Sequence, residues 1–106
     1  MSSIGTLEET VLLLVIIHQG NAYGVSIAEA YMEHAGRRIS IPAIHTVLKR
    51  LEKKGYLESG MSGATAERGG RRKRLFEITQ HGYRVLSELQ ASRAKLWSLA
   101  PKLSFN

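Results

Sequence analysis

The 106-residue sequence contains no cysteine and no aspartate, and its four histidines are scattered along the chain. Without cysteine there is no disulfide, no redox thiol and no thiolate ligand for zinc. The histidines lack the spacing of a metal site, so we expect no metal and no cofactor. The sequence also lacks a supported Ser-His-acid set and a P-loop lysine pattern, so we do not expect an enzyme.

Long apolar segments are also missing. The longest apolar run, Val11–Ile17, has seven residues, far fewer than the ~20 that cross a bilayer. The first residues carry neither the cationic segment nor the cleavage signature of a secretory signal. We therefore expect a cytoplasmic protein that makes no membrane contact.

The first 36 residues contain no Lys or Arg. Their acidic residues are Glu8, Glu9, Glu29 and Glu33. The whole chain nevertheless has 15 Lys and Arg residues and a net charge of +6. Most of these cations fall in two blocks, Arg37–Lys54 and Arg68–Arg74. Such segregation is typical of a protein that binds a polyanion such as nucleic acid, although many small basic proteins bind nothing specific.

Periodicity and capping signals predict three helices, a hairpin and a final helix. Thr6 and Glu9 have the spacing of a capping box, and Pro42 suits the first turn of the third helix. Gly36 suits the C-cap of the second helix, and Thr79 suits the N-cap of the last. A glycine-rich segment separates the two strands, and Pro101 ends the last helix. The expected helices are Leu7 to about Gln19, Val25–His34, Pro42–Lys54 and a segment from Thr79 to about Ala100, and the expected strands are Tyr56–Ser59 and Leu75–Ile78.

This order of elements is that of a winged helix-turn-helix followed by one more helix. The expected fold class is mainly α with a small β-hairpin, and the last helix is a C-terminal dimerisation helix. We expect residues 1–79 to form the DNA-binding domain and residues 80–106 to form the dimerisation helix and tail of a single compact unit.

The third helix has two different sides. Its apolar residues recur with the i, i+3, i+4, i+7 spacing that predicts a side facing the core. They are Ile44, Val47, Leu48 and Leu51. A helix with a cationic and polar outer side can enter the major groove of double-stranded DNA and reach base edges. The residues of this helix expected to contact DNA are Pro42, Ala43, His45, Thr46, Lys49, Arg50 and Lys53.

Two glycines and four cations, GGRRKR at residues 69–74, lead into the second strand. Cations at this place can neutralise phosphates beside the groove and release counterions. Alternatively, the run is a solvated hairpin edge whose charges prevent edge-to-edge aggregation. The wing residues expected to contact DNA are Arg71, Arg72, Lys73 and Arg74.

Several motifs in this order resemble the PadR family of transcriptional regulators. They are GTLEE at residues 5–9, AYGV at 22–25, LKRLEKKGYL at 48–57, and ERGGRRKR at 67–74 followed by EIT at 77–79 and Gly82. The resemblance covers nearly the whole chain, and the length is that of the family's short branch with a single C-terminal helix. It implies a homodimeric regulator of double-stranded DNA, most often a repressor, and some members release DNA when a small molecule binds. Two-fold symmetry then implies a pseudo-palindromic operator.

The sequence departs from the family pattern at the start of the third helix. The family usually has a Gly-Thr pair and a tyrosine there, where this chain has Pro42, Ala43 and His45. The returning wing strand often carries two aromatic residues, where this chain has Leu75 and Phe76. Contacts made by the family's tyrosine therefore do not carry over to His45.

An apolar stripe on the last helix follows a winged domain that is already complete, so a monomer would leave much of it in water. The resemblance implies that this helix packs against the N-terminal helix of a partner. The expected interface residues are Leu7, Val11, Leu14, Val85, Leu86, Leu89, Leu96 and Trp97. Trp97 is the single tryptophan; we expect it to anchor the interface, and it is also the candidate contact for a small-molecule effector.

The main alternative is a winged-helix module that binds an acidic protein or structured RNA and has no specific DNA site. The cationic outer side of the third helix favours DNA, because protein-binding versions often carry an apolar patch there.

Overall fold

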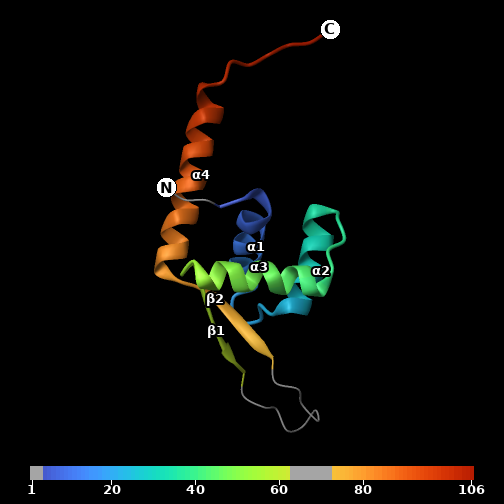
Figure 1. Cartoon of the computed structure of the whole chain (residues 1–106). Coiled ribbons are helices and arrows are strands. Elements are labelled where there is room, and N and C mark those ends of the chain that lie inside the picture. The colour runs from blue at the N-terminus through green and yellow to red at the C-terminus, as the bar shows by residue number, and fades with distance from the viewer. Residues whose placement is uncertain (1–3, 63–72) are drawn as a thin grey trace.

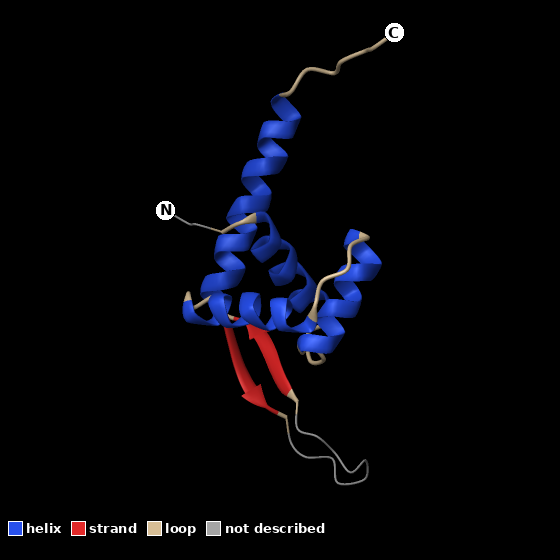
Figure 2. Ribbon diagram, turned by 45° about the vertical axis from the view of Figure 1, so that its right-hand side comes forward, coloured by secondary structure: helices blue, strands red, loops and turns tan. Residues whose placement is uncertain are grey.

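The computed structural model describes residues 4–62 and 73–106 of the chain. These residues form four helices and a two-stranded antiparallel sheet, in the order predicted from the sequence (Figures 1 and 2). The prediction of a mainly helical fold with a small β-hairpin is confirmed. The elements are α1 (Thr6–Ile17), α2 (Gly24–Ala35), α3 (Ile41–Lys53), β1 (Leu57–Met61), β2 (Arg74–Ile78) and α4 (Gln80–Leu99).

Local capping chemistry sets the ends of α2 and α3. The hydroxyl of Ser40 accepts a hydrogen bond from the Ala43 backbone N–H at 3.2 Å, and Pro42 lies in the first turn of α3. α2 ends at Gly36, whose φ of 71° is the left-handed conformation that favours glycine. Both boundaries agree with the signals in the sequence.

The predicted capping box of α1 is displaced by one residue. Gly5, rather than Thr6, precedes the helix, and the Gly5 backbone N–H donates to Glu8 Oε1 at 3.0 Å. Glu8 therefore takes the role that the sequence predicted for Glu9. Glu9 instead lies one position further around the helix, where its carboxylate meets α4.

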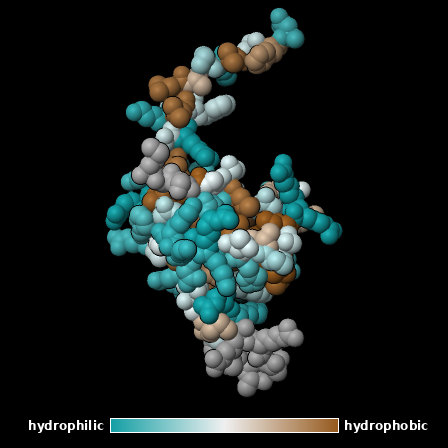
Figure 3. Space-filling model, in the orientation of Figure 1, coloured by the Kyte–Doolittle hydropathy of each residue, from teal (hydrophilic) through white to brown (hydrophobic). Residues whose placement is uncertain are grey.

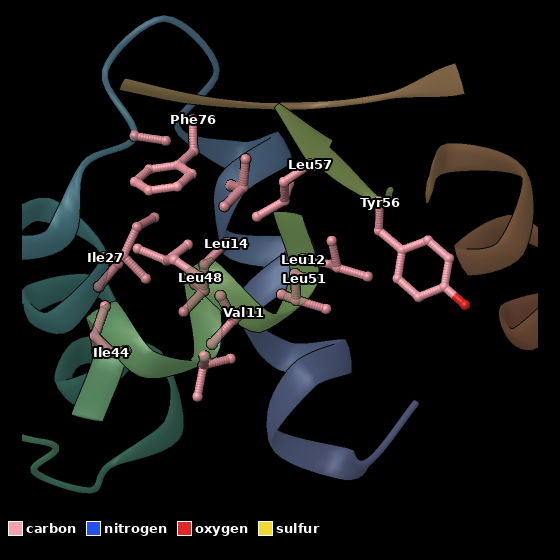
Figure 4. Packing of buried hydrophobic residues seen from close by; sticks show 14 of the residues in the cluster. Val11, Leu12, Leu14, Ile27, Ile44, Leu48, Leu51, Tyr56, Leu57 and Phe76 are labelled. Atoms are coloured by element: carbon pink, nitrogen blue, oxygen red, sulfur yellow. The ribbon is translucent and has the colours of Figure 1, made fainter. Parts of the chain in front are cut away.

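The hydrophobic core lies between α1, α2, α3 and the inner side of the hairpin (Figure 4). All four apolar residues predicted for the inner side of α3 are buried. The buried apolar residues of the described chain are Val11, Leu12, Leu14, Val15, Ala22, Ile27, Ala30, Ile44, Val47, Leu48, Leu51, Tyr56, Leu57, Phe76 and Leu86.

Three residues that the sequence assigned to a dimer interface belong to this core. Val11, Leu14 and Leu86 are buried within a single chain, so very little of their surface is left for a partner. The physical reason is that α1 is apolar on nearly every side, and the rest of the domain covers most of it. Leu86 is covered because the first turns of α4 lie against α1.

The hairpin is attached to the helices along β2. β1 and β2 pair with Leu57 opposite Ile78 and Ser59 opposite Phe76. The backbone N–H of Phe76 donates to the carbonyl of Ala22 at 2.8 Å, so the segment between α1 and α2 lies against the outer edge of β2. The Phe76 ring is fully buried, and it fixes this end of the hairpin in the core.

A close backbone contact joins the hairpin to α4. The Thr79 backbone N–H donates to the carbonyl of Tyr56 at 3.0 Å, and its hydroxyl donates to the carbonyl of Gly55 at 2.7 Å. The same hydroxyl accepts from the Gly82 backbone N–H at 2.9 Å, which confirms Thr79 as the N-cap. Gly82 packs directly on Tyr56, because an added Cβ would collide with its carbonyl oxygen and lie 2.9 Å from its Cα.

α4 extends beyond the domain after its first half, on the side opposite to the hairpin (Figure 1). Glu9 holds its middle, accepting from Gln90 Nε2 at 2.6 Å and from Arg93 Nη2 at 2.8 Å. Every residue from 91 to 106 is exposed. The radius of gyration, 16.4 Å, therefore exceeds the ~13 Å of a compact chain of this length.

The contact at Gly82 predicts a large difference between two glycine substitutions. Gly82→Ala should lower the free energy of unfolding by about 1–3 kcal/mol, because the methyl group would meet backbone that cannot turn aside. Gly60→Ala is the matched control, since an added Cβ there meets nothing within 4 Å. Urea denaturation of both variants measures the difference, and equal stabilities would contradict the close packing.

Candidate nucleic-acid interface

The outer side of α3 presents polar and cationic side chains to solvent. Thr46, Lys49 and Lys53 are exposed, while the four apolar residues on the other side of the helix are buried. Lys49 and Lys53 make no side-chain hydrogen bond or ion pair with residues 4–62 or 73–106. The middle of the face drawn in Figure 3, where Figure 1 places α3, is mainly hydrophilic. This surface is open to a polyanion.

His45 lies on the side of α3 that turns toward α2. It is exposed, yet its ring lies against the first residue of α2: a Cβ added to Gly24 would be 2.6 Å from His45 Nε2. Gly24 is buried and the ring takes the space that a side chain would need. His45 thus takes part in the packing of the helix pair, in addition to any contact with DNA.

Arg50 lies on the opposite flank of α3, which turns toward the start of α1. Its charge helps to stabilise the ionised carboxyl group of Glu8. Ala43 is half-buried and Pro42 is exposed at the first turn. Of the predicted α3 contacts, Pro42, Thr46, Lys49 and Lys53 therefore lie on the outermost side, and the remaining three lie on or near its flanks.

A partly buried ion pair fixes the end of α3. Lys54 Nζ lies 3.0 Å from both carboxylate oxygens of Glu8, which also accepts from the Gly5 backbone N–H. Burial alone would raise the pKa of Glu8, but the hydrogen bonds from Gly5 and Lys54, and the charges of Lys54 and Arg50, outweigh it and hold the pKa below its usual value. Glu8 is therefore an anion that ties α1 to the C-terminal end of α3.

The wing carries the other predicted contacts, and the structure describes two of the four. Lys73 and Arg74 are both exposed at the start of β2, whereas Arg71 and Arg72 lie outside the described residues. The Lys73 ammonium is 4.2 Å from the centroid of the Tyr23 ring. Arg74 Nη1 donates to Ser59 Oγ at 3.0 Å. Both cations thus have partners within the chain.

Sequence reasoning missed the partners of these wing cations. It gave Tyr23, Ser59 and Glu52 no role in holding the wing. The contacts of Lys73 with Tyr23 and of Arg74 with Ser59 join residues that are distant in the sequence, and the Ser59–Glu52 contact crosses the turn between α3 and β1, so helix or strand periodicity gives no signal for them.

The end of α4 and the tail carry an exposed apolar surface. Leu96 is 65% exposed, Trp97 82% and Phe105 86%, and brown residues at the top of Figure 3 mark this region. A hollow of about 600 Å³ lies among Trp97, Ala100, Pro101, Lys102, Leu103 and Phe105. Leu13 and Ile17 of α1 are also exposed, and the sequence analysis did not single them out. Leu7, Val85 and Leu89 are half-buried.

The described residues hold no arrangement of three or more His, Cys, Asp or Glu side chains suited to a metal ion. Within the same residues, no helix is long and apolar enough to cross a membrane.

A comparison with family models decides the identity of this arrangement. The transcriptional regulator PadR-like family matches residues 13–88, which include α2, α3, the hairpin and the first half of α4. The chain belongs to this family. PadR-like proteins are transcriptional regulators, so the expectation that the chain is not an enzyme is confirmed.

Solved PadR structures share the winged-helix fold. A PadR-like transcription factor from Bacteroides fragilis is 26% identical with a TM-score of 0.72, covering 89% of this chain and 85% of that chain. A PadR-like regulator from Bacillus cereus is 24% identical with a TM-score of 0.70, covering 89% and 86%. Bacillus subtilis PadR, solved in complex with operator DNA, is 16% identical with a TM-score of 0.64, covering 96% of this chain and 51% of that chain. No curated protein matches the sequence.

The lowered pKa of Glu8 predicts a loss of stability in acid. A carboxyl group whose pKa is lower in the folded than in the unfolded chain stabilises the fold fully above its unfolded pKa, and this contribution is lost as the pH falls through the folded pKa. Glu8→Gln should remove about 1–3 kcal/mol near neutral pH, because Lys54 loses its charged partner. Urea denaturation from neutral pH to about pH 3 should show a smaller pH dependence for Glu8→Gln than for the parent. An unchanged pH dependence would contradict an ionised, stabilising Glu8.

Proposed function

We propose that this PadR-family regulator binds double-stranded DNA sequence-specifically as a homodimer and represses transcription from a pseudo-palindromic operator. The observation that carries the proposal is the outer side of α3, where Thr46, Lys49 and Lys53 are exposed on a helix whose other side is buried. An α-helix fits the major groove, and its outward side chains can reach base edges there. Because its target is DNA, we place the protein in the cytoplasm.

We assign DNA binding and dimerisation to different parts of the chain. Residues 1–79 would bind DNA, with α3 in the major groove and the wing beside it, and residues 80–106 would form the dimer. Support for DNA as the partner comes from the solved complex of Bacillus subtilis PadR with operator DNA, whose fold this chain shares. The cationic charge of Lys49 and Lys53 suits phosphates at the edges of the groove.

The dimer proposal rests on surface that the single chain leaves in water. Leu96, Trp97 and Leu99 are exposed on α4, and Leu13 and Ile17 are exposed on α1. Apolar side chains gathered on a projecting helix mark an interaction site in a soluble protein. A second copy offers the same two surfaces, so a two-fold pair can cover α4 of each chain with α1 of the other.

An effector would bind at the end of α4. The hollow beside Trp97 is lined mainly by apolar side chains and the aromatic rings of Trp97 and Phe105. Such a lining suits a planar aromatic compound. Trp97 is the single tryptophan, so its fluorescence reports directly on this place. A panel of planar aromatic compounds that produces no saturable quenching would remove the effector from the proposal.

The first test compares two duplexes. The parent protein should bind the DNA upstream of its own gene more tightly than a scrambled duplex of the same length, as measured by fluorescence anisotropy across a salt series. The specific complex should persist at physiological salt, where the scrambled duplex dissociates. Equal binding to both, falling together with salt, would instead favour a non-specific polyanion binder or the interaction module considered above.

Two cations should contribute separately to phosphate binding. Lys49→Ala and Arg72→Ala should each weaken binding and lower the slope of log affinity against log salt by about one unit. The control is Lys102→Ala, because Lys102 is exposed in the tail beyond α4. A salt slope that does not change in either variant would show that the replaced cation makes no phosphate contact.

The dimer can be broken on α4 without disturbing the core. Leu96→Asp combined with Trp97→Asp should shift sedimentation from dimer to monomer, because both side chains are exposed in the single chain. Operator affinity should fall by about a hundredfold or more, since the second half-site no longer binds at high effective concentration. Ala91→Asp is the matched control, because Ala91 is exposed and lies on the side of the helix away from Leu96 and Trp97. A double variant that remains a dimer would place the interface elsewhere.

A further inference from the structure

The start of β2 is held by Lys73 through both its backbone and its side chain. The Ser62 backbone N–H donates to the Lys73 carbonyl at 2.7 Å, and the Lys73 N–H donates to Ser62 Oγ at 3.0 Å. The Lys73 ammonium lies 4.2 Å from the centroid of the Tyr23 ring. Tyr23 is the N-cap residue of α2, so this contact joins the wing to the connection between α1 and α2.

Arg74 is held on the other side of the hairpin. Its Nη1 donates to Ser59 Oγ at 3.0 Å, and Ser59 Oγ donates to Glu52 Oε2 at 2.7 Å. Glu52 is on α3, so the chain of contacts runs from β2 across β1 to the helix proposed to read DNA. A cation, a hydroxyl and a carboxylate in this order satisfy one another's hydrogen-bonding groups.

A backbone contact lies between these two attachments. The Phe76 N–H donates to the Ala22 carbonyl at 2.8 Å, which ties β2 to the residue before Tyr23. The described base of the hairpin is therefore fixed to the helix-turn-helix at both edges. Lys73 and Arg74 provide the two side-chain attachments, and these contacts hold both cations against the protein.

We propose that Lys73 and Arg74 are positioning residues, which fix the wing against the helix-turn-helix, and that they do not bind phosphates themselves. This inference rests on the proposed DNA binding and narrows its contact set. It removes Lys73 and Arg74 from the phosphate contacts expected for the cationic run. The wing and α3 then meet the duplex as one rigid unit, so that contacts beside the groove and contacts within it are made in a fixed register.

The positioning contact has a signature that does not depend on DNA. Protons on the Lys73 side chain over the Tyr23 ring should show upfield ring-current shifts in the NMR spectrum of the full-length protein. Tyr23→Phe should keep these shifts, because it keeps the aromatic face, and Tyr23→Leu should abolish them. Absence of the shifts in the parent protein would overturn the proposal, whatever the protein binds.

The DNA measurements then separate positioning from phosphate binding. Lys73→Ala should weaken operator binding roughly two- to fivefold and leave the salt slope unchanged. Tyr23→Leu should have a similar effect, Tyr23→Phe should restore affinity, and the double variant Tyr23→Leu with Lys73→Ala should be no weaker than either alone. Lys49→Ala is the reference for a residue that does lower the salt slope.

Arg74 is tested through its neighbour. Ser59→Ala keeps the cation and removes its hydrogen-bond partner, so it should weaken operator binding to the same extent as Arg74→Ala, with no change in salt slope. A slope lowered by about one unit in Lys73→Ala or Arg74→Ala would overturn the proposal and return that residue to the phosphate contacts. A parent protein that shows the NMR signature but binds no duplex would instead contradict the proposed function and leave the attachment of the wing established.

Discussion

The burial of one side of α3 is the constraint on which the rest of the candidate interface depends. Ile44, Leu48 and Leu51 are inserted between α1, α2 and the hairpin, where they are shielded from water. Because each residue of an α-helix turns by ~100°, fixing one side fixes the direction of every other side chain. Lys49 and Lys53 therefore face solvent, and within residues 4–62 and 73–106 no side-chain hydrogen bond or ion pair holds them there. Core packing is thus the main interaction that orients the surface proposed to meet DNA.

Beyond the contacts of Thr79, Gly82 and Leu86 at the start of α4, a buried carboxylate, Glu9, holds the middle of this helix. Glu9 is covered on α1, and a buried charge is costly unless it is paired and hydrogen-bonded. Gln90 and Arg93 of α4 supply those partners. This polar contact therefore helps to hold the angle at which the exposed half of α4 leaves the domain. In the proposed dimer the same angle would set the separation of the two α3 helices, and so the spacing of the half-sites.

Features encoded within one or two turns could be predicted from the sequence, and features formed across the fold could not. The order of elements, the two sides of α3 and the caps at Gly36 and Thr79 depend on neighbouring residues, and they were predicted correctly. The cap of α1 was misplaced by one residue, because Thr6 and Glu9 match the same motif that Gly5 and Glu8 satisfy through the backbone. Periodicity shows that a side chain is apolar but not what covers it, which is why Val11, Leu14 and Leu86 were assigned to a partner although they are buried within the chain.

In the wing, the sequence likewise shows which residues are charged but not which groups they contact. A run of four cations suggests four equal phosphate contacts, since sequence alone gives every Lys and Arg the same weight. Folding brings Tyr23 beneath Lys73 and brings Ser59 and Glu52 beside Arg74, so that two of the four acquire partners of the protein's own. Contacts within the protein therefore direct these two cations, whereas Lys49 on α3 has no such partner among the described residues. The net charge of +6 measures how strongly the molecule is attracted to a polyanion from a distance, and in the proposed complex the phosphate contacts would also depend on how the fold directs each cation.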